Sequence, residues 1–121
     1  MARIVLIDDD PFVREDLHTA LTGAGHDVVV HSGGNAAIKA IVADPPHLII
    51  TDIVMEDGEG MDLITKTGER CPDVGVIAIS SNQKYLQYAA ALGALLTMHK
   101  PFNPQDLLEK IAPLTEQVES T

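Results

Sequence analysis

Five short apolar runs, each followed by a segment of helical character, constrain the fold of this chain more than any other feature. The runs cover residues 4–7, 28–30, 48–50, 74–79 and 95–99. They are almost continuously apolar and lack the alternation of a sheet with one wet face, so each predicts a strand buried on both sides. Strands that alternate with helices predict a parallel sheet covered by helices on both faces.

The segments between the runs carry helix start and stop signals. The Asp-Pro pair at 10–11 and the Asn-Pro pair at 103–104 each join an N-cap residue to a proline in the first helical turn. Gly25 and Gly93 stand where two of the helices should stop. Helices are therefore expected over about residues 11–24, 34–44, 61–69, 84–92 and 104–114.

Two positions should weaken these helices. Gly68 weakens the third helix, and Pro113 should end or kink the last one near Ala112. No repeat or composition shift suggests a second domain. We expect one domain over residues 1–118, followed by a polar tail at 119–121.

The order of the strands follows from chain connectivity. Right-handed crossovers leave few topologies for five βα units. The commonest is the doubly wound, flavodoxin-like (βα)5 arrangement with strand order 2-1-3-4-5. We predict this α/β fold.

Polar side chains stand directly after four of the predicted strands. Asp8 and Asp9 follow the first strand, Asp52 the third, Ser80 the fourth and Lys100 the fifth. In the predicted order these four strands are neighbours about 4.8 Å apart, and open α/β sheets bind ligands at the carboxyl ends of their strands. Asp52 alone could merely close a strand or cap a turn. The convergence favours a single site.

Three carboxylates in one cleft repel one another and call for a cation. Oxygen-only ligands on an open surface suit Mg²⁺. Lys100 would add a positive charge and Ser80 a hydrogen bond for a phosphoryl oxygen. Asp52, between these helpers, can serve as a carboxylate nucleophile that forms an acyl phosphate.

Charge and hydropathy exclude several other classes of function. Eight Lys and Arg against 18 Asp and Glu give a net charge of −10, which opposes direct nucleic-acid binding. The single cysteine, Cys71, allows no internal disulfide. The apolar runs are too short for a signal peptide or a membrane span. We expect a cytoplasmic protein with no membrane association.

At its motifs the chain resembles the receiver domain of bacterial two-component response regulators, over residues 2 to about 118. The resemblance rests on residues 6–11 (LIDDDP), 52–55 (DIVM) with Gly60, 79–80 (IS) and 100–102 (KPF). It implies that Asp52 accepts a phosphoryl group that Ser80 and Lys100 contact. The magnesium ligands that it implies are Asp9, Asp52 and the carbonyl of Val54, with Asp8 assisting through water. It also implies a cis peptide bond between Lys100 and Pro101.

The resemblance further implies partners. Similar domains receive a phosphoryl group from a phosphohistidine on a sensor histidine kinase or a histidine phosphotransfer protein, and they hydrolyse the product themselves. No output segment is recognisable, so we expect output through contact with a downstream protein of unknown identity. A stand-alone regulator, a phosphorelay intermediate and a receiver from a longer protein all remain open.

Three positions depart from the family pattern. Glu56 stands where proline is usual, Thr97 replaces the aromatic residue that moves on activation, and Ser81-Asn82 follows Ser80 in place of an alanine. The first and third positions bear on the rates of the chemistry, and the second on signal readout.

Two other functions are disfavoured by the sequence. A haloacid-dehalogenase-type phosphatase would use Asp8 of the Asp-x-Asp at 8–10 as nucleophile, but Phe12 stands where such enzymes need threonine. A degenerate receiver that only binds a partner is disfavoured because the acceptor-site residues are all present.

Overall fold

The computed structural model describes residues 2–54 and 60–119, with side chains described through Thr115. Five parallel strands form one sheet in the order β2-β1-β3-β4-β5. The strands are β1 (Arg3–Ile7), β2 (Asp27–His31), β3 (Leu48–Asp52), β4 (Gly75–Ser80) and β5 (Leu96–His99). The predicted fold class and strand order are confirmed.

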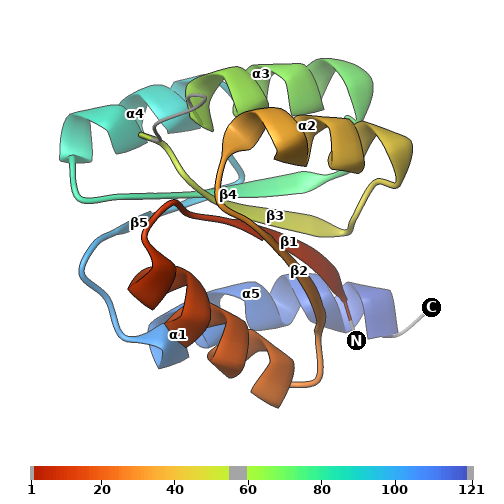
Figure 1. The fold of residues 1–121 in the computed structure, drawn as a ribbon, viewed down its shortest axis with the longest axis vertical. Coiled ribbons are helices and arrows are strands. Elements are labelled where there is room, and N and C mark those ends of the chain that lie inside the picture. Colours follow the sequence, from red (N-terminus) through yellow and green to blue (C-terminus); the bar gives the residue numbers. More distant parts are fainter. Residues whose placement is uncertain (1, 55–59, 120–121) are drawn as a thin grey trace.

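The helices form a layer on each face of the sheet. Helices α1 (Pro11–Gly23) and α5 (Pro104–Glu119) cover one face, and α2 (Gly34–Ala43), α3 (Gly60–Arg70) and α4 (Gln83–Ala91) cover the other (Figure 1). Within residues 2–54 and 60–119, no helix combines the length and apolarity needed to cross a membrane.

Two apolar cores lie between these layers, one on each side of the sheet. Successive residues of β1 supply them in turn: Leu6 packs with α1 and α5, whereas Val5 and Ile7 pack with α2, α3 and α4. Leu6 pairs with Ile50 of β3, and both are fully buried. The continuous apolar runs therefore reflect burial on both faces, as predicted.

Helix boundaries follow the predicted local signals. The Asp10 side chain accepts a hydrogen bond from the Phe12 N–H at 2.9 Å and caps α1, and Pro11 fills its first turn. Gly25 and Gly93 adopt φ values of +93° and +113°, which L side chains rarely tolerate. Both glycines thus stand where the chain must turn after a helix.

Pro113 was expected to end or kink the last helix near Ala112, and the expectation of an end there is wrong. Helix α5 continues through Pro113 and ends at Glu119. Pro113 is exposed, whereas Ile111 and Thr115 on either side of it are buried. Proline removes one backbone donor, but the buried side of the helix continues past it and keeps the next turn packed.

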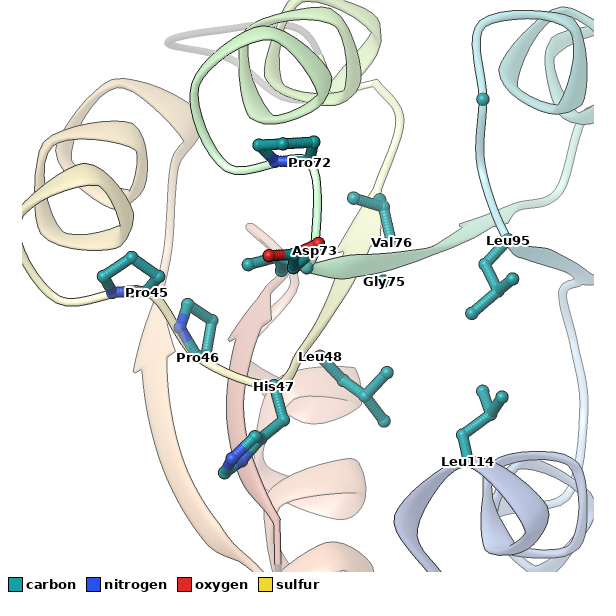
Figure 2. A pocket seen from close by; sticks show the side chains of 12 residues that line it. Pro45, Pro46, His47, Leu48, Pro72, Asp73, Gly75, Val76, Leu95 and Leu114 are labelled. Carbon is teal, nitrogen blue, oxygen red and sulfur yellow. The ribbon is translucent and has the colours of Figure 1, made fainter. Parts of the chain in front are cut away.

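A hollow of about 650 Å³ opens at the amino-terminal edge of the sheet, between the segments that lead into β3, β4 and β5 (Figure 2). Its lining is mostly apolar and includes Pro46, Leu48, Leu95 and Leu114. Among the described residues that line the hollow, Asp73 is the only one with a carboxylate. The predicted cluster of acidic side chains lies at the opposite, carboxyl-terminal edge.

Two glycines in α3 make a matched test of the packing beside that edge. A Cβ added at Gly60 would collide with the Asp52 carbonyl oxygen and lie 2.7 Å from Ile53 Cα, whereas nothing lies within 4 Å of one added at Gly68. We expect Gly60→Ala to lower the free energy of unfolding by about 1–3 kcal/mol, because backbone must move. Gly68→Ala should raise it by about 0.5–1 kcal/mol, since alanine loses less chain entropy in a helix.

Urea denaturation of both variants measures these changes. Equal effects of the two substitutions would show that α3 does not approach β3 as closely as described.

Candidate functional site

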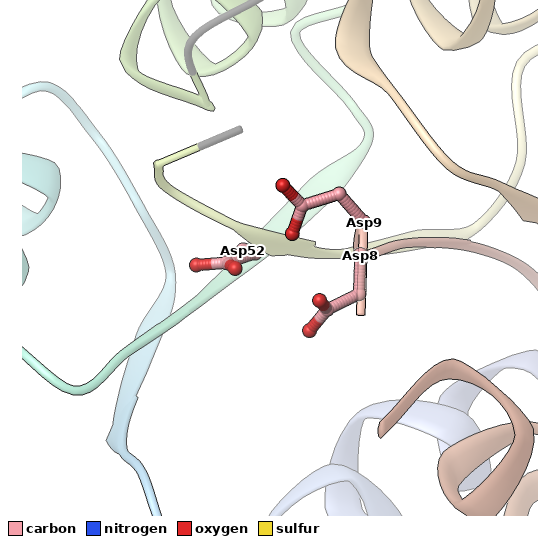
Figure 3. A group of neighbouring side chains, drawn as sticks. All are labelled: Asp8, Asp9 and Asp52. Atoms are coloured by element: carbon pink, nitrogen blue, oxygen red, sulfur yellow. The ribbon is translucent and has the colours of Figure 1, made fainter. Parts of the chain in front are cut away.

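Three carboxylates meet at the carboxyl-terminal edge of the sheet. Ile7 of β1 pairs with Thr51 of β3, so the residues that follow them, Asp8 and Asp52, emerge side by side. One carboxylate oxygen from each of Asp8, Asp9 and Asp52 lies within 4.8 Å of the other two. Figure 3 shows the three side chains projecting toward a common space. The structure thus brings together the acidic residues that the sequence predicted.

Asp8 is the most constrained member of the cluster. It is completely buried, and one of its oxygens accepts a hydrogen bond from the Asp10 N–H at 2.9 Å. Its other oxygen accepts from Lys100 Nζ at 2.8 Å. Arg14 donates to the Asp8 carbonyl at 2.9 Å. Asp8 therefore acts as a fixed anchor inside the site.

Lys100 reaches the cluster from the end of β5. Its ammonium donates to Asp8 at 2.8 Å and to Asp52 at 3.3 Å, and its side chain is 19% exposed. Its backbone N–H donates to the Ser80 carbonyl at 2.8 Å, which ties the end of β5 to that of β4. The Lys100–Pro101 peptide bond is cis, as the resemblance implied.

Burial and charge shift two pKa values in the site. Burial raises the pKa of Asp52 above its ordinary value, and repulsion from Asp8 adds to this, while Lys100 opposes it. Burial lowers the pKa of Lys100, but hydrogen bonds and attraction from Asp8 and Asp52 outweigh it, so the pKa is raised overall.

These shifts have opposite consequences for stability. Ionisation of Asp52 lowers the free energy of unfolding as pH rises from the ordinary aspartate pKa through the raised one. Lys100 contributes stability below its ordinary pKa, and that contribution is lost as pH rises through its raised value. At neutral pH, the Lys100 ammonium therefore offsets part of the repulsion among the carboxylates.

Ser80 ends β4 beside the cluster. Ile79, the residue before Ser80 in the chain, pairs with Asp52 of β3. The Ser80 hydroxyl accepts a hydrogen bond from the Asn82 N–H at 3.0 Å, and the residue is only 3% exposed. Thr97 lies on β5 and pairs with Ala78 of β4. Ser80 is thus next to the site, one strand from Thr97.

Asn82 links Ser80 to the start of α4, a role that was not predicted from the sequence. Its side-chain oxygen accepts hydrogen bonds from the N–H groups of Lys84 and Tyr85 and so caps α4. A polar residue before an apolar helical segment signals such a cap. Its simultaneous bond to Ser80 depends on the loop conformation, which the sequence does not reveal.

The donor set fits a magnesium ion. All side-chain ligands are carboxylate oxygens, and Asp9 and Asp52 remain partly open to solvent. Val54 lies two residues after Asp52 and has an exposed side chain; the ligand role of its carbonyl stays a prediction. Glu56 lies outside the described residues.

The chain matches a family model and curated relatives over most of its length. The family model of the response regulator receiver domain matches residues 4–112. The DNA-binding transcriptional regulator NtrC of Rhizobium meliloti is 32% identical over 109 residues. That match covers 88% of this chain but only 22% of the regulator, so the chain spans about a fifth of that relative.

Solved structures share the fold. A CheY-like receiver domain protein from Methanospirillum hungatei is 27% identical, with a TM-score of 0.89 over 100% of this chain and 99% of that one. The chemotaxis response regulator CheY4 of Vibrio cholerae, at 23% identity, has a TM-score of 0.86 over 94% of this chain and 98% of its own.

Removing one charge from the cluster should stabilise the metal-free protein. Lys100 pairs with Asp8 and Asp52, so Asp9 adds repulsion without sharing that ion pair. We expect Asp9→Asn to raise the melting temperature in EDTA by a few degrees. The variant should also lose most of the further rise that Mg²⁺ produces in the wild type, because binding to the folded state stabilises it.

Thermal unfolding with and without Mg²⁺ makes the measurement. Asp73→Asn, which removes the same charge at the opposite edge, is the control and should leave the Mg²⁺ effect intact. A lower melting temperature for Asp9→Asn in EDTA would contradict the repulsion argument.

Proposed function

Because this chain belongs to the response regulator receiver domain family, we propose that Asp52 is the residue that accepts its phosphoryl group. The family is a phosphoacceptor module of two-component signalling and not a metabolic enzyme. The observation that carries the assignment is the bond from Lys100 to both Asp8 and Asp52, at the point where the strands end. Of the two carboxylates, Asp52 is the one still partly open to solvent.

The proposed reaction transfers a phosphoryl group from a nitrogen or oxygen atom of the donor to a carboxylate oxygen of Asp52. A carboxylate oxygen of Asp52 forms a bond to phosphorus as the bond from phosphorus to the donor breaks, and the donor leaves with that electron pair. When the donor is a phosphohistidine, the leaving group is the imidazole. Attack by water on the same phosphorus returns free Asp52 and inorganic phosphate.

Lys100 and Ser80 are proposed to bind the incoming phosphoryl group. Lys100 already lies 3.3 Å from an Asp52 oxygen and supplies a compact positive charge. Ser80 supplies a hydroxyl that rotates to suit its partner. Together they offset negative charge that the transfer brings into an acidic site.

Asp8, Asp9, Asp52 and the Val54 carbonyl are the residues that would hold Mg²⁺. When bound, the ion would supply charge neutralisation for phosphoryl oxygens. Asp8 is completely buried, whereas Asp9 and Asp52 are partly open to solvent, which supports a role for Asp8 through water and direct roles for Asp9 and Asp52.

Receiver domains interact with histidine kinases or histidine phosphotransfer proteins, and we assign this chain a donor of that kind in the cytoplasm. The NtrC relative is described as DNA-binding, but for this chain we propose output through contact with a downstream protein. The phosphatase alternative is weaker, because its nucleophile would be Asp8, which is completely buried, whereas Asp52 is partly open to solvent.

Phosphorylation of Asp52 can be tested with acetyl phosphate. We expect the wild type to gain an acid-labile phosphoryl label in Mg²⁺ and to gain none in EDTA. Asp52→Asn should abolish labelling, because the amide is a poor nucleophile. Peptide mapping after borohydride reduction identifies the labelled residue, with Asp10→Asn as a control that keeps the label. A label that persists in Asp52→Asn and maps to Asp8 would favour the phosphatase.

Signal readout is proposed to run from Ser80 into the start of α4. Moving the Ser80 hydroxyl toward a phosphoryl group gives up its bond with the Asn82 N–H, and Asn82 caps α4. Thr97 offers no large ring to relocate, and its β-branched side chain is stiff. The conformational change should therefore concentrate in residues 80–88.

Amide chemical shifts on adding beryllofluoride and Mg²⁺ measure this readout. We expect the largest shifts at residues 80–88, strong suppression by Ser80→Ala, and a nearly unchanged response in Thr97→Ala. If Thr97→Ala removes the response and Ser80→Ala spares it, the signal leaves through β5 instead.

A further inference from the structure

Strand β2 is an apolar edge strand that the phosphoacceptor site does not use. It stands at the end of the sheet order and pairs with β1. Val29 is 53% exposed and Val30 is 41% exposed. Edge strands usually carry lysine, proline or a bulge that prevents pairing with another chain, and the sequence DVVVH of β2 contains no lysine or proline.

The backbone of β2 offers free hydrogen-bonding groups on its outer side. The Asp27 N–H donates to the Ala2 carbonyl at 3.0 Å, and the His31 carbonyl accepts from the Asp8 N–H at 3.2 Å. Backbone groups alternate in direction along a strand, so Asp27, Val29 and His31 bond toward β1. The N–H and C=O groups of Val28 and Val30 therefore point away from the sheet.

We propose that two copies of this chain associate by antiparallel pairing of their β2 strands, with Val29 of each on the two-fold axis. This register sets Val28 opposite Val30 of the second copy, so that each such pair exchanges both N–H···O=C bonds. An isologous contact of this kind uses the same strand twice and closes as a dimer.

The side chains fit the same register. Asp27 comes opposite His31 of the second copy, and His31 opposite its Asp27. Asp27, Val29 and His31 share one face of the strand, since they pair with Arg3, Val5 and Ile7 in turn. Cross-strand pairs in the non-hydrogen-bonded position hold their side chains closest together, with about 4.5 Å between Cα atoms. The strand is thus self-complementary in its side chains, with a carboxylate opposite an imidazole, as well as in its backbone hydrogen bonding.

A hollow beside this edge agrees with a partner there. It measures about 280 Å³, and its lining includes Val29, His31 and Ala40 together with the charged residues Arg3, Asp27 and Asp44, so it leaves room for a side chain of the second copy. The net charge of −10 on each copy opposes association at long range, so the contact should be weak at low salt.

The test is sedimentation velocity of the whole chain over a range of concentrations in about 0.5 M NaCl, where long-range repulsion is screened. We expect a reversible dimer. Val30→Pro removes an outward N–H without touching the bonds to β1 and should weaken the dimer about tenfold or more. Tyr88→Lys, which alters an exposed side chain on α4, is the control and should leave dimerisation unchanged.

A mixing experiment tests the register. Asp27→His sets histidine against histidine, and His31→Asp sets aspartate against aspartate, so each variant alone should dimerise about tenfold or more less tightly than the wild type. An equal mixture restores both complementary pairs and should form a heterodimer. Circular dichroism confirms that each variant is folded.

Three results would overturn the proposal: a wild type that stays monomeric at millimolar concentration, a dimer that survives Val30→Pro but not Tyr88→Lys, or folded single variants that do not recover in the mixture.

Discussion

The contact of Lys100 with Asp8 and Asp52 is the interaction on which the candidate site depends. Three carboxylate oxygens within 4.8 Å of one another would repel strongly at neutral pH, and the ammonium stands between two of the three groups. The cis peptide bond to Pro101 and the backbone bond to Ser80 accompany that placement. One lysine at the end of β5 thereby links the ends of β1 and β3.

The same contact explains how the site divides its carboxylates. Asp8 is completely buried and accepts hydrogen bonds from Lys100 and from the Asp10 N–H, so it holds Lys100 in place away from the solvent. Asp52 is partly open, and burial raises its pKa while Lys100 opposes the rise. A carboxylate that is poorly solvated and only partly compensated is well suited to binding a cation or to attack on phosphorus. Burial of the two apolar cores on the faces of the sheet offsets the free-energy cost of the repulsion among the carboxylates.

Hydrogen bonds also connect the site to the start of α4. Ser80 is the last residue of β4, and its hydroxyl bonds to the loop residue that caps α4. A change at the acidic edge can thus alter the start of a helix through a short chain of hydrogen bonds. The exposed Tyr85 and Tyr88 lie on that helix, whereas the apolar β2 edge lies at the far side of the sheet. The two surfaces are separate parts of the molecule.

The sequence by itself determined the strand order, the helix caps at Asp10 and Asn103, and the convergence of Asp8, Asp9, Asp52, Ser80 and Lys100. These features depend on apolar periodicity, local hydrogen bonding and the rule that parallel strands end on one edge. Only the tertiary structure decided that Lys100 contacts two carboxylates, that Asn82 joins Ser80 to α4, and that α5 continues through Pro113. Each of these depends on packing between segments distant in the chain or on the path of a loop, and neither is encoded in local spacing.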